Sequence, residues 1–195
     1  GTLELTSLRA DQVGGFVIEP INRGVRYFDA RFGVLLGGGM GGDGMSFCYG
    51  ELSLTTPLTE LGTPYDGLCV RLRTHMHLAI EITANGSTLV AQRIGTAIRS
   101  GMFMPVRFGR NAGNGAYAAF EPGPEGTAIM LNVSEAELAP LYTPTDTWRF
   151  GFGARTGKLS DQHRVDAISI TSPAFVTSAM LNFSVANNGQ QFSMG

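Results

Sequence analysis

Several features that mark common protein classes are scarce or absent in this sequence of 195 residues. Its 14 lysines and arginines are outnumbered by 16 aspartates and glutamates, which gives a formal net charge of −2. Binding to nucleic acid regardless of sequence, or to an anionic membrane surface, needs a basic surface that this balance does not supply. No apolar run approaches the roughly 20 residues that a membrane-spanning helix needs. We therefore expect no nucleic-acid partner and no membrane insertion.

Signs of helices and of domain boundaries are also missing. No apolar stripe with helical spacing extends beyond two turns, and no linker or low-complexity tract interrupts the chain. Since 195 residues suit one domain and 43% of them are hydrophobic, residues 1–195 are expected to form a single domain with a sizeable core. The one helix candidate is 134–141, where Ser134 and Glu137 form a capping box and Pro140 ends the helix early.

Glycine and alternating runs, by contrast, are abundant. Glycine accounts for 27 residues, about twice the usual share, and it separates runs in which apolar and polar residues alternate. Asn85-Gly86 is the strongest hairpin signal, because a type I′ turn needs positive φ at both central residues. Many short strands in one domain predict an all-β fold, a two-sheet sandwich or a barrel. The alternation predicts twelve strands, at 15–19, 25–36, 44–49, 68–74, 77–83, 88–93, 105–109, 116–120, 129–133, 148–154, 165–171 and 175–185.

Two successive runs, 68–74 and 77–83, carry charges in an unusual arrangement. Alternation places Cys69, Arg71 and Arg73 on one face of the first run and apolar residues on the other. Glu81 lies on the solvent face of the second run. If the two strands pair, we expect Arg–Glu contacts across them, each worth less than about 1 kcal/mol when exposed. The charged face is then either a ligand or metal site or a solvated surface without a function.

Three motifs, in the same order as in a known family, carry a resemblance over some 135 residues. Residues 37–47 (GGGMGGDGMSF) resemble the glycine-rich loop, Asp and strand of legume-type lectins. Residues 68–82 (LCVRLRTHMHLAIEI) resemble the metal-binding strand pair of those lectins. Residues 148–172 (WRFGFGARTGKLSDQHRVDAISITS) resemble their late strand, binding loop and following strand.

The sequence is therefore similar to the concanavalin A-like superfamily, which includes legume and L-type lectins and LamG-like modules, and it resembles divergent extracellular members. The resemblance implies two packed antiparallel sheets in a jelly-roll sandwich, with a secreted or cell-surface location and glycans as ligands.

The same resemblance implies that the metal pair of the lectins is lost. Their first strand supplies a Glu and an Asp to calcium and manganese, and the matching positions here are Arg71 and Arg73. A guanidinium offers no ligand atom to a hard cation. The ligand-bearing loop between the strands is reduced to His75 and Met76, and His77 matches a metal-binding His that we expect to be a surface imidazole. We expect no metal and no cofactor; calcium held by Asp43 and nearby carbonyls is a third reading.

Asp43 matches the Asp that binds sugar hydroxyls in the lectins, so it is the first candidate ligand-binding residue, together with Gly41 and Gly42 of the preceding loop. An ion pair of Asp43 with Arg71 or Arg73 is the structural alternative.

Residues 155–163 match the variable specificity loop of the lectins. Loops at the edge of a rigid sandwich are where binding residues usually lie. Arg155, His163 and Asp166 have a structural alternative, a network that holds the hairpin together. Sugar sites usually also have an aromatic platform. Four tyrosines are candidates for it: Tyr49, Tyr65, Tyr117 and Tyr142. The polar residues that this loop offers to a ligand are Lys158, Ser160, Asp161, Gln162 and His163.

The only two cysteines are Cys48 and Cys69. In the family their strands are antiparallel neighbours, so the resemblance implies a disulfide that closes a loop of about 20 residues and contributes about 3 kcal/mol. Two reduced thiols are the alternative. Asn-x-Ser sequons at Asn85, Asn132 and Asn182 favour a glycoprotein from a secretory pathway, although chance also explains three.

Catalysis is not expected. Glycoside hydrolases of this superfamily need two facing carboxylates, and their E-x-D-x-x-E strand signature is absent. Ser160, Asp161 and His163 are too close in sequence to reach the geometry of a catalytic triad, and no G-x-S-x-G or H-E-x-x-H motif occurs.

The leading hypothesis is an extracellular, non-catalytic, glycan- or matrix-binding module. The alternative is a structural or adhesion domain of a larger surface protein that contacts other proteins. Residues 181–195 are expected to be the last strand or to lead into a following domain, and the start at Gly1 without a visible signal peptide is expected of a processed or excised fragment.

Overall fold

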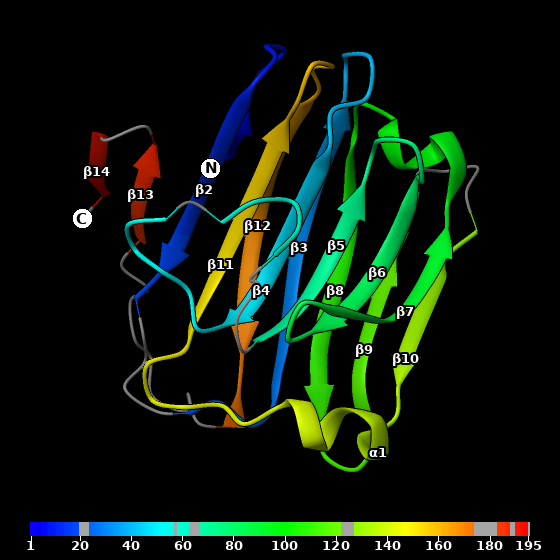
Figure 1. Ribbon diagram of the computed structural model, residues 1–195, viewed down its shortest axis with the longest axis vertical. Helices are drawn as coiled ribbons and strands as arrows, with labels where there is room; N and C mark the ends of the chain where they lie inside the picture. The colour runs from blue at the N-terminus through cyan, green and yellow to red at the C-terminus, as the bar shows by residue number, and fades with distance from the viewer. Residues whose placement is uncertain are drawn as a thin grey trace.

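The computed structural model describes residues 1–19, 24–56, 58–62, 67–121, 127–173, 183–187 and 190–194. Within these ranges the chain forms two antiparallel sheets stacked face to face (Figure 1). The predicted all-β jelly-roll sandwich is confirmed. One sheet has six strands in the order β1-β12-β3-β8-β9-β10, and the other has eight in the order β14-β13-β2-β11-β4-β5-β6-β7.

Eleven of the twelve predicted strands correspond to observed ones, and much of the twelfth, 175–185, lies outside the described residues. The four-residue strand β1 was not predicted. The six-stranded sheet consists of β1 (Leu3–Thr6), β12 (Gln162–Thr171), β3 (Phe28–Gly37), β8 (Phe103–Asn111), β9 (Gly115–Phe120) and β10 (Ile129–Val133). The eight-stranded sheet consists of β14 (Gln190–Met194), β13 (Phe183–Asn187), β2 (Gln12–Ile18), β11 (Arg149–Thr156), β4 (Gly44–Gly50), β5 (Gly67–Arg73), β6 (Ala79–Ala84) and β7 (Ser87–Arg93).

Local signals in the sequence explain the short helices and the tight turn. Helix α1 (Glu135–Leu138) begins at Ser134, whose side chain and that of Glu137 form the predicted capping box, and the 3-10 helix η2 (Ala139–Leu141) follows at Pro140. A further 3-10 helix, η1 (Gly95–Arg99), connects β7 to β8. Asn85 and Gly86 adopt φ of 49° and 76°, as the predicted hairpin between β6 and β7 requires.

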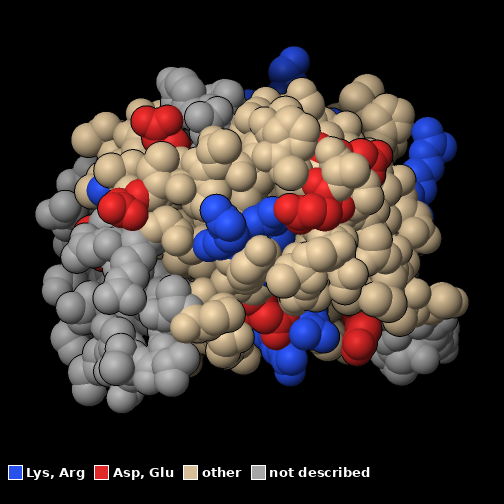
Figure 2. All heavy atoms as spheres, turned by 90° about the horizontal axis from the view of Figure 1, so that it is seen from below, with Lys and Arg blue, Asp and Glu red and all other residues tan. Residues whose placement is uncertain are grey.

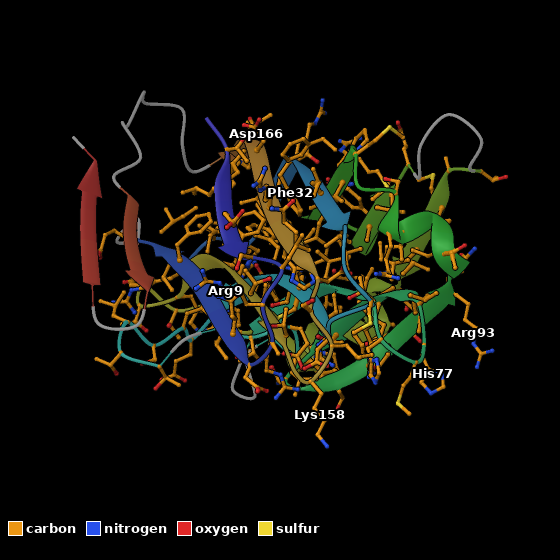
Figure 3. All side chains as sticks on the ribbon, turned by 90° about the horizontal axis from the view of Figure 1, so that it is seen from above. Arg9, Phe32, His77, Arg93, Lys158 and Asp166 are labelled. Carbon is orange, nitrogen blue, oxygen red and sulfur yellow. A yellow bond between two sulfur atoms is a disulfide. The ribbon has the colours of Figure 1, made fainter. Side chains whose placement is uncertain are left out.

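The core between the sheets is largely aromatic. The rings of Phe47 and Phe152, from adjacent strands, have centroids 4.5 Å apart, and Phe32 approaches Phe152 from the other sheet at 4.9 Å. Figure 3 shows Phe32 among the side chains that fill the space between the sheets. Because alternate residues of a strand face opposite sides, the neighbours of these residues, such as Ser46 and Cys48, lie on the outer face of the eight-stranded sheet.

A segment between β4 and β5 crosses that outer face (Figure 1). We call it the strap, and define it as residues 51–56 and 58–62. It lies directly on the sheet because the strands beneath it carry glycine: a Cβ at Gly153 would overlap the Leu58 carbonyl, and one at Gly151 would lie 2.8 Å from Leu52 Cδ1. Leu52 and Leu58 complete a second apolar cluster with Val17 and the two cysteines.

The predicted disulfide between Cys48 and Cys69 is confirmed. The two residues stand directly opposite each other in the pairing of β4 with β5. A Cβ at Gly62 would lie 2.9 Å from Cys69 Sγ, so the strap covers the disulfide closely. The disulfide therefore belongs to the packing beneath the strap.

Replacing Gly153 by alanine is predicted to lower the free energy of unfolding by about 2 kcal/mol, because the added methyl group pushes the strap off the sheet. Gly33→Ala is the matched control, since its Cβ would be in ordinary contact with the Phe103 ring at 3.4 Å and the Asp166 carbonyl oxygen at 3.7 Å. We expect the control to be neutral or more stable by up to about 1 kcal/mol. Urea unfolding measures both, and equal effects of the two substitutions would contradict the account of the strap.

Candidate functional site

Four loops meet at one end of the sandwich, the upper end in Figure 1, and we call this end the rim. They are residues 7–11, 37–43, 74–78 and 157–161. Backbone hydrogen bonds hold them together: Met40 N–H donates to Ser160 O at 2.9 Å, Asp11 N–H to Gly157 O at 2.9 Å, and Thr74 N–H to Asp43 O at 3.2 Å. The topology thus brings together the glycine-rich loop and the hairpin that the sequence predicts to bind a ligand.

Asp43 is held at the rim by Arg155. Arg155 Nε lies 3.0 Å from Asp43 Oδ2, and Arg155 Nη2 donates a hydrogen bond of 2.6 Å to Glu60 Oε1. The predicted pairing of Asp43 with Arg71 or Arg73 is wrong, because β11 runs beside β4 and presents Arg155 first, while both other arginines turn to Glu81.

Glu60 brings the strap into the site, a contribution that the sequence did not predict. Its side chain is 4% exposed, whereas that of Asp43 is 23% and that of Arg155 is 42% exposed. Burial raises the pKa of the Glu60 carboxyl, and the positive charge of Arg155 opposes that shift. One guanidinium therefore joins strand β11, the glycine-rich loop and the strap.

Arg71, Arg73 and Glu81 form the predicted cross-strand contacts. Arg71 and Glu81 are register partners in β5 and β6, and Glu81 carboxylate oxygens lie 3.9 Å from Arg71 Nη1 and 3.7 Å from Arg73 Nη1. The expected solvent exposure is wrong for two of them, since Arg71 is 8% and Glu81 7% exposed. The strap supplies the cover: its Thr59 carbonyl accepts a 2.6 Å hydrogen bond from Ser46, the residue opposite Arg71.

Asp161, the last residue of the fourth rim loop, is fully buried. Its carboxylate accepts hydrogen bonds from Arg99 Nε at 2.8 Å and from the Gly39 backbone N–H at 3.0 Å. Asp161 and Arg99 thus fix the glycine-rich loop, and the predicted ligand-binding role of Asp161 is corrected to a structural one. Gly41 and Gly42 are corrected in the same way, because both are buried and a Cβ at Gly42 would lie 2.9 Å from Thr156 Cγ2.

His163 is also fully buried, so its predicted contact with a ligand is corrected. Its Nδ1 lies 2.6 Å from Thr6 Oγ1, and that hydroxyl donates to the Asp161 carbonyl at 3.1 Å. Since the hydroxyl has one proton to give, Nδ1–H is the donor to Thr6. Burial lowers the pKa of His163 to about 4, so the ring is neutral at pH 7.

The alternative network of Arg155, His163 and Asp166 is not a single network. His163 pairs with Thr6, whereas Asp166 accepts hydrogen bonds from Thr2 Oγ1 at 3.1 Å and from Ala167 N–H at 2.7 Å. Asp166 therefore supports the irregular stretch of β12 near Ala167, whose φ is 50°.

The rim residues that do reach solvent form a smaller set than predicted. Lys158 is exposed and points outward (Figure 3), and Ser160 is half-buried. Gln162 is half-buried and donates to Glu4 Oε2 at 3.0 Å. Two methionines not predicted for the site, Met40 and Met76, are 71% and 83% exposed.

Three of the four tyrosines proposed for an aromatic platform are not accessible to a ligand. Tyr49, Tyr117 and Tyr142 are buried, and Tyr65 lies outside the described residues. Exposed apolar surface at the rim comes from Met40, Met76 and Leu8 instead.

The residues at the positions of the family's metal ligands do not fit a hard cation. Arg71 and Arg73 offer no oxygen, and His77 stands exposed at the start of the next strand region. Within the described ranges, no group of three or more His, Cys, Asp or Glu side chains is placed to hold a metal ion. No described helix is long and apolar enough to span a membrane.

Comparison with known proteins identifies the fold. No protein-family model matches the sequence, and no curated protein does. Among solved structures, the chain is similar to the metal-free exoplasmic/lumenal domain of VIP36, with 16% identity over 96% of this chain and 85% of that one and a TM-score of 0.71.

Two plant proteins are similar in the same way. A winged bean acidic lectin, solved with methyl-α-D-galactose, shares 19% identity over 88% of this chain and 86% of its own, with a TM-score of 0.71. Arcelin-5, a lectin-like defense protein from Phaseolus vulgaris, shares 16% over 88% and 86%, with a TM-score of 0.67. The chain has the concanavalin A-like, legume lectin-like fold.

The burial of His163 predicts that acid destabilises the protein. The unfolded chain binds a proton at this imidazole below a pKa of about 6.5, whereas the folded chain resists protonation down to about 4. Stability is therefore lost as the pH falls through this window. Between pH 6.5 and pH 5 we expect wild type to lose about 1.5 kcal/mol more than His163→Gln in urea unfolding.

His77→Gln is the control for this experiment, because it removes an exposed imidazole. It should keep the wild-type dependence on pH. Parallel pH profiles for wild type and His163→Gln would contradict the structural role of the buried ring.

Proposed function

We propose that this chain is a non-catalytic, metal-independent lectin-type module that binds glycans, free or in the extracellular matrix, outside the cell or in a secretory lumen. The observation that carries the proposal is the Asp43 carboxylate, which stands half-buried at the rim and is oriented by Arg155. A carboxylate held in this way accepts hydrogen bonds from two neighbouring hydroxyls, the groups that every sugar ring offers.

The surroundings of Asp43 suit a sugar. A Cβ at residue 157 would lie 3.3 Å from Asp43 Oδ2 and 3.4 Å from Oδ1, so glycine at this position keeps the approach to both oxygens open. Lys158, the next residue, offers a donor. Met40 and Met76 lie on loops that bond to the hairpin and to Asp43, and they offer apolar area for the C–H face of a ring.

Fixed charges support the absence of a metal requirement. Arg155 orients Asp43, and the Arg71–Glu81–Arg73 contacts occupy the strands on which the resemblance places the metal ligands. The glycine-rich loop is held by Asp161 and Arg99. Each part of the site is thus positioned by protein groups, and bound cations are not needed for its shape.

The same ion pairs argue against catalysis. Four carboxylates at or near the rim each lie within 4.0 Å of an arginine: Asp43 and Glu60 share Arg155, Asp161 faces Arg99, and Glu81 faces Arg71 and Arg73. A glycosidase needs one carboxylic acid that carries a proton and a second carboxylate across the bond. The pairing supports binding without bond cleavage.

An extracellular or lumenal location is supported by the buried disulfide, which persists in oxidising compartments and is rare in the cytosol. The three sequons agree with such a location.

A second candidate function rests on a different face. A shallow groove of about 730 Å³ on the outer side of the six-stranded sheet is lined by Gly33, Phe103, Pro105 and Met130, among others. Phe103 is 42% and Met130 65% exposed. Exposed apolar area of this kind is typical of contacts with other proteins, as a structural or adhesion domain would make.

Asp43→Ala is predicted to weaken glycan affinity on an array by at least about tenfold, because the carboxylate that accepts hydrogen bonds from the sugar hydroxyls is lost. The variant should remain folded, since Arg155 keeps Glu60 as its partner. Asp11→Asn, an exposed acid of the same rim, is the matched control and should bind as wild type does. EDTA should leave wild-type binding unchanged.

The outcomes separate the readings. Binding that survives Asp43→Ala would contradict the site, and binding lost in EDTA would contradict metal independence. No glycan binding at all would favour the structural or adhesion domain.

A further inference from the structure

Three arginines form a row across the outer face of the eight-stranded sheet. The pairing registers place Arg155 opposite Gly44, Gly44 opposite Arg73, Arg73 opposite Ala79, and Ala79 opposite Arg93. Directly opposed residues in antiparallel strands project from the same face. The row therefore reads Arg–Gly–Arg–Ala–Arg over β11, β4, β5, β6 and β7, and we call it the arginine row.

The face is the outer one, because the chain neighbours Ala154, Leu72 and Ile80 are buried in the core. Adjacent strands are about 4.8 Å apart, so the arginines, on alternate strands, recur about every 10 Å. The strap covers the next rows, where Ser46 and the disulfide lie. The arginine row lies beyond the strap, between it and the rim.

The cations of the row lie nearer to solvent than the carboxylates that accompany them. Arg155 is 42% exposed and Glu60 only 4%; Arg73 is 37% exposed and Glu81 only 10%. Arg93 is exposed, and no described carboxylate lies within 4.0 Å of it. Glu60 and Glu81 thus lie deeper than the guanidinium groups, and Asp43, which is 23% exposed, lies beside Arg155 on its rim side. The guanidinium groups remain the most exposed charges of the row.

At the opposite end of the sandwich the acid is more exposed than the arginine it pairs with. There Arg110 is 5% exposed and its partner Glu135 is 35% exposed. Figure 2, which views that end, shows acidic and basic side chains interspersed. Figure 3 shows Arg93, His77 and Lys158 projecting outward from the lower and right-hand part of that view.

We propose that the arginine row binds an extended anionic polysaccharide, with its chain lying across the strands. Guanidinium groups bind carboxylates and sulfates through paired N–H donors, and a row of them with a regular spacing suits a polymer that repeats its charge. Gly44 has no side chain and Ala79 has only a methyl group, so no bulky side chain lies between the arginines. This site adds to the rim and does not require that the rim bind a neutral sugar.

The test uses matched polymers and titration calorimetry on the intact chain. Dextran sulfate is compared with dextran, and polygalacturonate with its methyl ester, so that each pair shares one sugar backbone and differs in its anionic group. We expect binding to one or both of the charged polymers and none to the neutral ones. A charged polymer that binds identifies the anion as sulfate, carboxylate or either.

The variants assign the binding to the row. Arg93→Gln, on the exposed edge strand, and Arg73→Gln should each raise the dissociation constant for a bound charged polymer by at least about fivefold. Two exposed arginines elsewhere are controls, Arg26→Gln near the opposite end and Arg31→Gln on the other sheet, and each should change it less than about twofold.

No binding to either charged polymer overturns the proposal, and so does an equal loss in the control variants, which would indicate diffuse attraction. The result is distinguishable from that for the rim. Glycan binding that needs Asp43, together with no binding to charged polymers, would support the proposed lectin function and contradict the proposed role of the arginine row. Binding to charged polymers that needs Arg93, together with no glycan binding that depends on Asp43, would support the arginine row and contradict the rim site.

Discussion

The architecture of the rim depends on Arg155, whose guanidinium contacts both Asp43 and Glu60. A carboxylate as buried as Glu60 is costly without a cation beside it, by several kcal/mol. Arg155 offsets that cost for the strap residue Glu60, and in the same position it contacts Asp43. The binding carboxylate, the strap and the disulfide beneath it are in this sense one unit.

Glycine residues in the sheet let the strap approach the strands, and ion pairs stabilise the charges that the strap buries. The strap reaches the backbone of β11 because Gly151 and Gly153 have no side chains, and it then covers Arg71 and Glu81. Burial in turn requires that those charges be paired, which the register of β5 and β6 ensures. The result is a concanavalin A-like sandwich whose rim is ordered by its own arginines and acids.

Features set by neighbours in sequence could be predicted from the sequence. Alternation correctly assigned the two faces of β5, the Asn85-Gly86 turn followed from its φ requirement, and the cap at Ser134 followed from residues three apart. The disulfide followed from the resemblance, which placed the two strands side by side.

Features set by distant partners could not be predicted. Arg155 and Glu60 are 95 residues apart, and Arg99 and Asp161 are 62 apart, with no pattern that links either pair. Polar residues in the predicted binding hairpin, such as Asp161 and His163, are buried because loops from elsewhere in the chain close over them. The arginine row depends on four registers at once, each set by the length of a connection and by packing.

The most direct test of the central role of Arg155 is a double-mutant cycle with Glu60→Gln and Arg155→Met, read by urea unfolding. If the guanidinium holds the strap through the buried carboxylate, the effects of the two substitutions will be coupled by more than about 1 kcal/mol. Effects that add to within about 0.3 kcal/mol would show that strap and rim are independent, and would contradict the account.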